Sequence, residues 1–441
     1  MSALHFALTP KMKPLPGNRS VLVAALDIGT SKIACLIGRL RPQPQPLQDG
    51  SRLRSHSVEV VGFGHTLARG MKAGTVIDLA EAEAAVRQCA DLAERSARMQ
   101  LDSVVVSVSA GRPASEQISA SIEVVGSAIG EGDIARVLAA GSRHSARPGR
   151  AVLHSLPIGY VLDQARGIQD PRGMLAREFG IDMHVVTADA SAARNLMLAI
   201  ERSHLAVEAM VTSPYAAGLS ALADDEAELG AALVDMGAGT TTVAVFCGTR
   251  FVHADGFGLG GRHVTMDLAR GLNARIADAE RLKTLYGSVL TGGSDERDMI
   301  AVPAVDNDER EAPHFVSRAS LARIIKPRVE EILEMVRDRL AVSPFAAEPR
   351  GRVVLTGGAS QLTGVADLAT QILRRPVRVG RPLDIAGLPE EARGGAFAVA
   401  TGLLVYPQAA HLEHFEPRRT RHSATGGGYI ARVGRWLRES F

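Results

Sequence analysis

The sequence predicts an α/β fold that is internally duplicated and built as two lobes. Apolar runs of strand length alternate with segments of helical period along the 441 residues. A strand, an Asp-x-Gly turn and two more strands come early in the chain, and the same order returns about 200 residues later, which indicates a duplication. A self-contained unit of strands and a helix separates the two copies and predicts an inserted subdomain.

The composition limits the class of protein. Hydrophobic residues make up 46 %, charged residues 22 %, and the formal net charge is +2, which predicts a soluble globular protein whose main partner is not nucleic acid. No apolar run approaches the roughly 18 residues of a membrane-spanning helix, and the start of the chain lacks the pattern of a signal peptide. Cys35, Cys89 and Cys247 lie in apolar segments and are predicted to be buried, reduced thiols. The 13 histidines show no metal-binding spacing.

Apolar patterning locates the elements of the first copy and of the inserted unit. Residues 1–19 have no such pattern and are predicted to be a disordered tail, and the proline-rich residues 41–57 are predicted to be a loop. The predicted strands are 21–27, 32–40, 58–65, 103–109, 118–125, 152–162, 183–187 and 209–212, and the predicted helices are 79–97, 133–142, 190–202 and 215–222.

The second copy repeats the strand order of the first. A polar stretch with weak strand signals runs to residue 316, and Pro327 is expected to bend or start the long helix that follows. The predicted strands are 231–235, 241–247, 250–257, 352–355 and 377–379, and the predicted helices are 262–272, 278–286, 320–340, 362–373 and 394–406.

Each copy has a polar glycine turn between its first two strands. Backbone N–H groups of two opposed turns, aided by hydroxyls and a lysine, could hold the triphosphate of ATP in a shared cleft. Asp27 and Asp235 end the preceding strands and would hold Mg²⁺ through its retained waters. The phosphate-binding candidates are Gly29, Thr30, Ser31 and Lys32 in the first turn and Gly237, Ala238, Gly239, Thr240 and Thr241 in the second.

A third glycine turn completes the predicted nucleotide site. Gly357 and Gly358 follow a strand and precede a helix, where an adenosine could lie against the backbone. Each turn alone is usually only a tight turn or a helix cap. The three turns in order, with the same three-strand context in both copies, make the pattern specific.

These motifs resemble those of the actin, sugar kinase and chaperone ATPase superfamily. Residues 278–283 are similar to the helix by which bacterial actins contact ribose and adenine, which implies nucleotide contacts for Glu280 and Lys283. Three features narrow the resemblance to the FtsA family of bacterial cell division proteins. They are the insert, the segment Ala68-Arg69-Gly70-Met71 followed by Gly74 and Asp78, and the C-terminal residues 434–441.

The resemblance implies a duplicated actin-like (ribonuclease H-like) two-lobe ATPase fold. It further implies a protein that binds ATP and forms filaments at the septum, on the inner face of the cytoplasmic membrane. There it would tether the tubulin-like division ring protein FtsZ through subdomain 2B and bind other division proteins. The implied parts are 1A (20–109 and 187–210), the inserted 1C (110–186), 2A (211–261 and 330–407), 2B (262–329), a flexible linker (408–427) and a membrane-targeting amphipathic helix (428–441).

The last fourteen residues have the pattern of a membrane-binding helix. Apolar side chains share one face, arginines that would attract anionic headgroups share the other, and the only tryptophan suits the interface. A helix docked on the protein's own core is the alternative, and the glycine run at 426–428 counts against it. The predicted membrane-binding residues are Tyr429, Ile430, Arg432, Val433, Arg435, Trp436, Leu437, Arg438 and Phe441.

One departure from the family pattern predicts slow hydrolysis at most. Hydrolytic relatives place Glu or Gln before the Pro-x-Ala-Ala helix to orient water, whereas this chain has Ser213. Serine without a partner is not a general base near pH 7. A scaffold is therefore predicted in preference to a pilus-assembly ATPase, a kinase or another enzyme of the same superfamily.

Three other signals are interpreted as carrying no chemistry. The basic stretch 136–150 is predicted to be solvated surface, although it could also contact a neighbouring subunit or an acidic partner, and the acidic run 224–226 is predicted to be a solvated turn. Ser107 and Ser109 alternate as strand residues do and have no histidine at a spacing that indicates a nucleophile.

Overall fold

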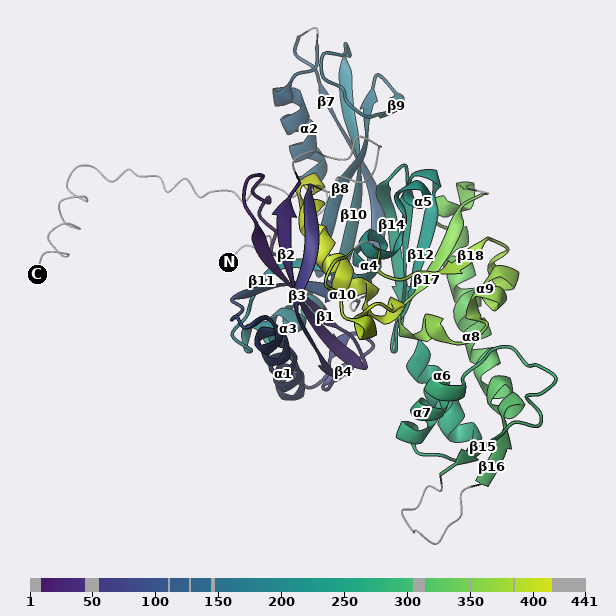
Figure 1. Cartoon of the computed structure of the whole chain (residues 1–441). Helices are drawn as coiled ribbons and strands as arrows, with labels where there is room; N and C mark the ends of the chain where they lie inside the picture. The colour runs from purple at the N-terminus through teal and green to yellow at the C-terminus, as the bar shows by residue number, and fades with distance from the viewer. Residues whose placement is uncertain are drawn as a thin grey trace, which may run out of the picture.

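The computed structural model describes residues 9–43, 55–109, 112–126, 128–143, 147–303, 314–348, 350–383 and 385–414. Two five-stranded sheets form two lobes, and a four-stranded sheet belongs to a subdomain that projects from them (Figure 1). Helices α4 (Ser213–Ala221) and α10 (Ala398–Val405) lie between the lobes (Figure 1). The arrangement confirms the predicted two-lobe α/β fold with an insertion.

The first lobe is built on a sheet of order β11-β6-β1-β2-β3. A Cβ on Gly64 of β3 would lie 2.6 Å from backbone atoms of Cys89 and Ala93, so glycine allows α1 to pack closely on this strand. The elements are β1 (Val21–Ile28), β2 (Lys32–Pro42), β3 (His56–Leu67), β4 (Met71–Lys72), β5 (Thr75–Val76), α1 (Leu79–Ala97), β6 (Ser103–Val108), α3 (Ala190–Glu201) and β11 (Ala206–Thr212).

The second lobe has the sheet order β14-β13-β12-β17-β18. In both lobes three antiparallel strands continue into two parallel ones, so the duplication predicted from the sequence is confirmed in the strand pairing. The elements are α5 (Asp224–Leu229), β12 (Ala231–Met236), β13 (Thr241–Cys247), β14 (Arg250–Phe257), α8 (Arg318–Ala341), η2 (Pro344–Ala347), β17 (Arg352–Thr356), η3 (Gly358–Gln361), α9 (Val365–Leu373), β18 (Val377–Val379), η4 (Glu390–Ala392) and η5 (Gly395–Phe397).

Two smaller parts lie at opposite ends of the molecule (Figure 1). One extends the second lobe and contains α6 (Gly261–Gly271), α7 (Ile276–Tyr286), β15 (Met299–Val302), β16 (His314–Ser317) and the start of α8. The other is the insertion, with β7 (Ala114–Glu123), α2 (Glu131–Arg143), β8 (Arg150–Leu162), β9 (Ala165–Ile168) and β10 (Glu178–Asp189). It has an apolar cluster of its own, centred on Phe179 and Ile181.

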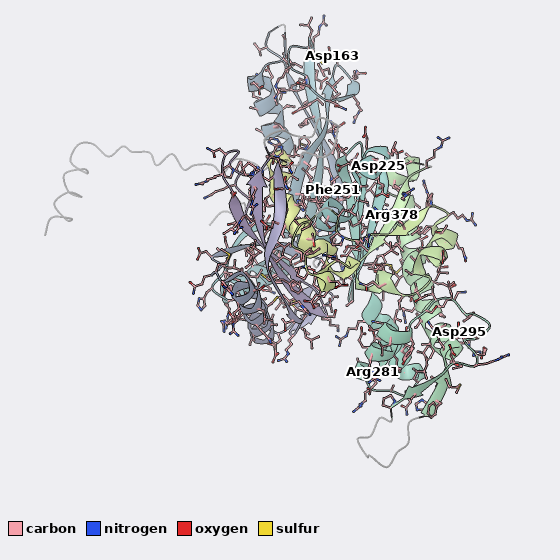
Figure 2. The ribbon with its side chains drawn as sticks, viewed as in Figure 1. Asp163, Asp225, Phe251, Arg281, Asp295 and Arg378 are labelled. Carbon is pink, nitrogen blue, oxygen red and sulfur yellow. The ribbon has the colours of Figure 1, made fainter. Side chains whose placement is uncertain are left out.

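The insertion is covalently part of the first lobe but hydrogen-bonds to the edge strand β14 of the second. Burial lowers the pKa of His184 to about 3, so the imidazole is neutral. Its Nδ1–H donates to the carbonyl of Phe251 at 2.8 Å, and its Nε2 accepts from Ser115, whose Oγ accepts the N–H of Ala254 at 3.0 Å. Figure 2 labels Phe251 at this junction.

The two central helices cross in direct backbone contact. A Cβ on Gly402 of α10 would lie 1.7 Å from the carbonyl oxygen of Ala216 in α4, so only glycine allows this approach. One apolar cluster includes both helices and residues of both lobes. The position of one lobe relative to the other is therefore set at this crossing.

Both ends of the described chain pack on the body, which corrects two predictions. Of the disordered tail predicted at 1–19, the described residues 9–19 include Thr9, whose hydroxyl donates to Val152 O at 2.8 Å, and Met12, which joins the core. Of the linker predicted at 408–427, residues 408–414 are packed on the folded body, where η6 (Tyr406–Gln408) and η7 (Ala410–Leu412) are followed by the buried Glu413. Partners distant in the sequence hold both segments.

One further prediction about local structure was wrong, and one of the two alternatives for Pro327 is excluded. Residues 224–229 form α5 instead of a solvated turn, because Glu226 is buried and accepts hydrogen bonds from Arg352 at 3.1 Å and Arg378 at 2.7 Å. Figure 2 shows Asp225 and Arg378 in this part of the second lobe. Helix α8 continues through Pro327 and does not start there. No helix in the described ranges is both long and apolar enough to cross a bilayer.

Candidate functional site

The two polar turns have the same backbone geometry. The N–H of Gly29 donates to Lys32 O at 2.9 Å in the first turn, and the N–H of Gly237 donates to Thr240 O at 2.9 Å in the second. A Cβ on either glycine would lie 2.9 Å from that same carbonyl oxygen. The duplication therefore extends to individual atoms of the turns.

The two turns meet between the lobes. Thr30 of the first turn is buried against Gly239 of the second, where a Cβ would lie 2.8 Å from Thr30 Cγ2. The Oγ1 of Thr30 also accepts the N–H of Gly74 at 3.1 Å. The sequence predicted that the turns converge, but it did not predict that Thr30 packs between three segments. Ser31 beside it is exposed.

The two aspartates and Lys32 form a coupled group of charges. Burial raises the pKa of Asp27, although Lys32 and the Ser107 hydroxyl, which donates to Asp27 Oδ1 at 2.7 Å, act in the opposite direction. Burial and then the charge of Asp27 raise the pKa of Asp235 to about 7. Burial lowers the pKa of Lys32 to about 8 against the attraction of both carboxylates. Ser107, discounted as a nucleophile, has a positioning role instead.

Lys32 also contacts a segment that the sequence did not assign to the site. Its Nζ donates to Ala396 O at 2.6 Å and lies 3.2 Å from the ring centroid of Phe397. In the same segment Gly395 O accepts the N–H of Gly357 at 3.2 Å. The segment η5 thus joins the first turn to the third.

The third turn packs against the second and leaves one position open. Gly357 has φ +86°, in the left-handed region, and a Cβ there would lie 2.5 Å from Met236 O and against the carboxylate of Asp235. A Cβ on Gly358 would have no neighbour within 4 Å. Gly358 therefore faces open space next to Gly357, which borders the carboxylate of Asp235.

The residues predicted on α7 lie close to the same turns. The Nζ of Lys283 donates to Gly261 O at 3.1 Å, to Thr265 Oγ1 at 2.9 Å and to Glu280 Oε2 at 2.7 Å. A Cβ on Gly261 would lie 3.1 Å from the Cβ of Ala359, which follows the third turn. Thr265 was not predicted, because only the packing of α6 on α7 brings its hydroxyl to the lysine.

Within the described residues, no side chain is hydrogen-bonded to the hydroxyl of Ser213 at the start of α4. Thr212 Oγ1 and Ser213 Oγ are buried and have no hydrogen-bond partner in the described part of the chain. The imidazole of His154 contacts this turn, but its Nε2 accepts the N–H of Thr212 at 2.9 Å and so has no free lone pair. The slow hydrolysis expected from Ser213 stays a prediction.

Other candidate features do not add to the site. Within the described ranges, no group of three or more His, Cys, Asp or Glu side chains is placed to hold a metal. A cleft of about 310 Å³ lies between β7, β14 and the turn after α8 and contains none of the predicted residues. The three cysteines are free thiols; two are buried and Cys247 is half-buried. Residues 415–441, with all the predicted membrane-binding side chains, lie outside the described residues.

Two lobes of equal strand order, with paired turns meeting between them, define an actin-like protein. Solved structures share this fold. The PilM-PilN type IV pilus biogenesis complex matches with a TM-score of 0.59 at 18 % identity, over 88 % of this chain and 99 % of that one. MreB5 of Spiroplasma citri bound to ADP matches with a TM-score of 0.51 at 14 % identity, over 89 % and 98 % of the two chains.

Sequence comparison gives the family. The model for the cell division protein FtsA matches residues 232–402, and the model for the SHS2 domain inserted in FTSA matches residues 110–187. FtsA of Agrobacterium fabrum is 52 % identical over 440 residues, covering 99 % of this chain and 98 % of that protein. FtsA of Escherichia coli is 31 % identical over 427 residues, covering 95 % and 98 %. The chain belongs to the FtsA family of cell division proteins.

Proposed function

We propose that the chain is an ATP-binding, actin-like filament protein that anchors FtsZ to the inner face of the cytoplasmic membrane at the division septum. This proposal rests on one observation: three glycine turns meet around Asp27 and Asp235 in a chain of the FtsA family. Identity of 52 % to an FtsA over almost the whole chain supports a division role over a pilus-assembly role.

The residues of the site fit a magnesium nucleotide. Asp27 and Asp235 are oxygen ligands of the kind Mg²⁺ prefers, and a cation would relieve the cost of burying both charges. The open side of Gly358 would accept the adenosine, with Glu280 and Lys283 near its ribose. Ser31 and Ala238 would face the phosphates, whereas Thr241 is buried and its hydroxyl donates to Leu259 O at 2.8 Å.

Hydrolysis should be slow and dispensable for assembly. ATP and a non-hydrolysable analogue should both support filaments on an anionic lipid monolayer, imaged by electron microscopy, and FtsZ should be recruited to the coated lipid. Turnover should stay far below the ~10 s⁻¹ typical of enzymes, because the Ser213 hydroxyl has no hydrogen-bond partner among the described residues to make it a general base. The control variant Ser213→Ala should hydrolyse ATP at the same rate. Fast turnover that this variant eliminates would make the chain an enzyme.

Membrane binding should depend on the C-terminal helix predicted at 428–441. Trp436→Glu places a charge on its apolar face, and deletion of 428–441 removes it, so both variants should lose sedimentation with anionic liposomes. The matched variant Trp436→Phe should still sediment. All three should keep the melting temperature of the parent protein. Undiminished lipid binding by the truncated chain would contradict membrane anchoring through this helix.

The proposed contact with FtsZ lies at the end of the second lobe farthest from the insertion (Figure 1). Met299 on β15 and Phe315 on β16 are exposed there, as is Leu285 on α7. Exposed large apolar side chains of this kind support a protein-binding surface. Self-association and other division proteins would use further surfaces.

A further inference from the structure

A buried histidine joins the start of α4 to the last described segment of the chain. His154 on β8 is fully buried, and its Nε2 accepts the N–H of Thr212 at 2.9 Å. The ring proton is therefore on Nδ1, which donates to Glu413 Oε1 at 2.8 Å. The imidazole also packs edge-on against Tyr215 of α4, with ring centroids 5.0 Å apart.

Several hydrogen bonds hold the segment that contains Glu413. The N–H of His414 donates to Ser155 O at 2.8 Å, and Ser142 Oγ donates to His414 O at 3.2 Å. The ammonium of Lys11, from the N-terminal segment, donates to the carbonyl of Glu413. Residues 413 and 414, at the end of the 408–414 segment, are thus fixed at the insertion, and residues 415–427 separate them from the predicted membrane-binding helix at 428–441.

The other end of this link lies beside the candidate nucleotide site. Thr212 ends β11 and pairs with Val108 of β6, and the neighbouring residue Ser107 donates to the carboxylate of Asp27 at 2.7 Å. The carboxyl ends of parallel strands meet at one edge of a sheet, so Thr212 and Asp27 share that edge. A displacement of α4 by a bound nucleotide would therefore reach His154 through one hydrogen bond.

We infer that His154 is a positioning residue that couples nucleotide binding to the position of residues 408–414. A neutral imidazole suits this role because one nitrogen accepts from an amide while the other donates to a carboxylate. Coupling between two sites is reciprocal, so whatever shifts the 408–414 segment must also change nucleotide affinity. The inference rests on the proposed nucleotide site, and it gives that site a route to the membrane-binding end of the chain.

Hydrogen exchange of the full-length protein, with and without a non-hydrolysable ATP analogue and Mg²⁺, tests the coupling. In the parent protein the analogue should slow exchange in the turns at 27–32 and 235–241, and also in residues 408–414. In His154→Leu the turns should still respond, whereas residues 408–414 should exchange at least about tenfold faster and no longer respond. His154→Gln, whose amide can also accept and donate, should restore the response.

The outcomes separate this inference from the function on which it rests. An unchanged response of residues 408–414 in His154→Leu, or no response there in the parent protein while the turns respond, would overturn the coupling alone. No protection of the turns would overturn the nucleotide site and the coupling with it. If His154→Leu does not fold, Glu413→Leu removes the same hydrogen bond from the other side. Glu413→Gln is its matched control, and the hydrogen-exchange results are interpreted in the same way.

Discussion

Gly358→Asp should abolish ATP binding without unfolding the chain. A Cβ at this position has no neighbour within 4 Å, so the backbone can accept a side chain. The added carboxylate would occupy the space proposed for adenosine and would lie near Asp235 and the phosphates. An unpaired charge in such a site costs about 3 kcal/mol or more, which is over about 100-fold in affinity. Isothermal titration calorimetry with ATP and Mg²⁺ measures the loss.

Matched variants separate a blocked site from a damaged fold. Gly358→Ala adds only a methyl group to open space and should bind ATP far better than Gly358→Asp, and both should melt like the parent protein. Gly237→Asp should also lose ATP, but a Cβ there lies 2.9 Å from Thr240 O, so part of its effect would come from the turn itself. Tight binding by Gly358→Asp would show that the nucleotide lies elsewhere.

Gly402→Ala should be among the most destabilising single-methyl changes in this protein. The new Cβ would overlap the carbonyl oxygen of Ala216, and relief requires α4 and α10 to separate. Because overpacking of this kind is resisted by a dense core, we expect a loss of about 3 kcal/mol or more in the free energy of unfolding. Urea unfolding followed by circular dichroism measures it.

Gly132→Ala provides the control for this variant. Gly132 is also helical, in α2, but a Cβ there has no neighbour within 4 Å. Alanine should therefore leave stability unchanged or raise it by up to about 1 kcal/mol through helix propensity. Equal stability of the two variants would mean that α4 and α10 do not cross at the distance described.

Local patterns in the sequence predicted the strands, the duplication and the insertion. Helix α1 and strands β13 and β14 have the predicted limits, because their apolar periodicity and end residues are local signals. Glu226 shows what local signals miss. Three acids in a row are typical of a solvated turn, yet this carboxylate is buried by arginines 126 and 152 residues away in the chain. Thr9 and Glu413 were misjudged for the same reason.

Local sequence patterns also predicted one part of the candidate site and missed another. The glycine turns identified the convergence of Asp27 and Asp235, because their spacing repeats in the sequence. Two contacts within the site were not predicted: the Ser107 hydroxyl on a neighbouring strand holds Asp27, and Phe397 of η5 in the second lobe packs against Lys32. Such positioning residues have no sequence motif, since their contacts depend on which segments the fold brings together.

The hydrogen bonds between the insertion and β14 limit which segments of the chain can be exchanged between relatives in a chimera. Ser115 and His184 belong to the insertion, while the carbonyl of Phe251 and the N–H of Ala254 belong to the other lobe. A chimera that transplants the inserted segment alone would break this match wherever the donor lacks the serine and the histidine. A chimera should therefore exchange two separate segments of the chain together, the insertion and strand β14.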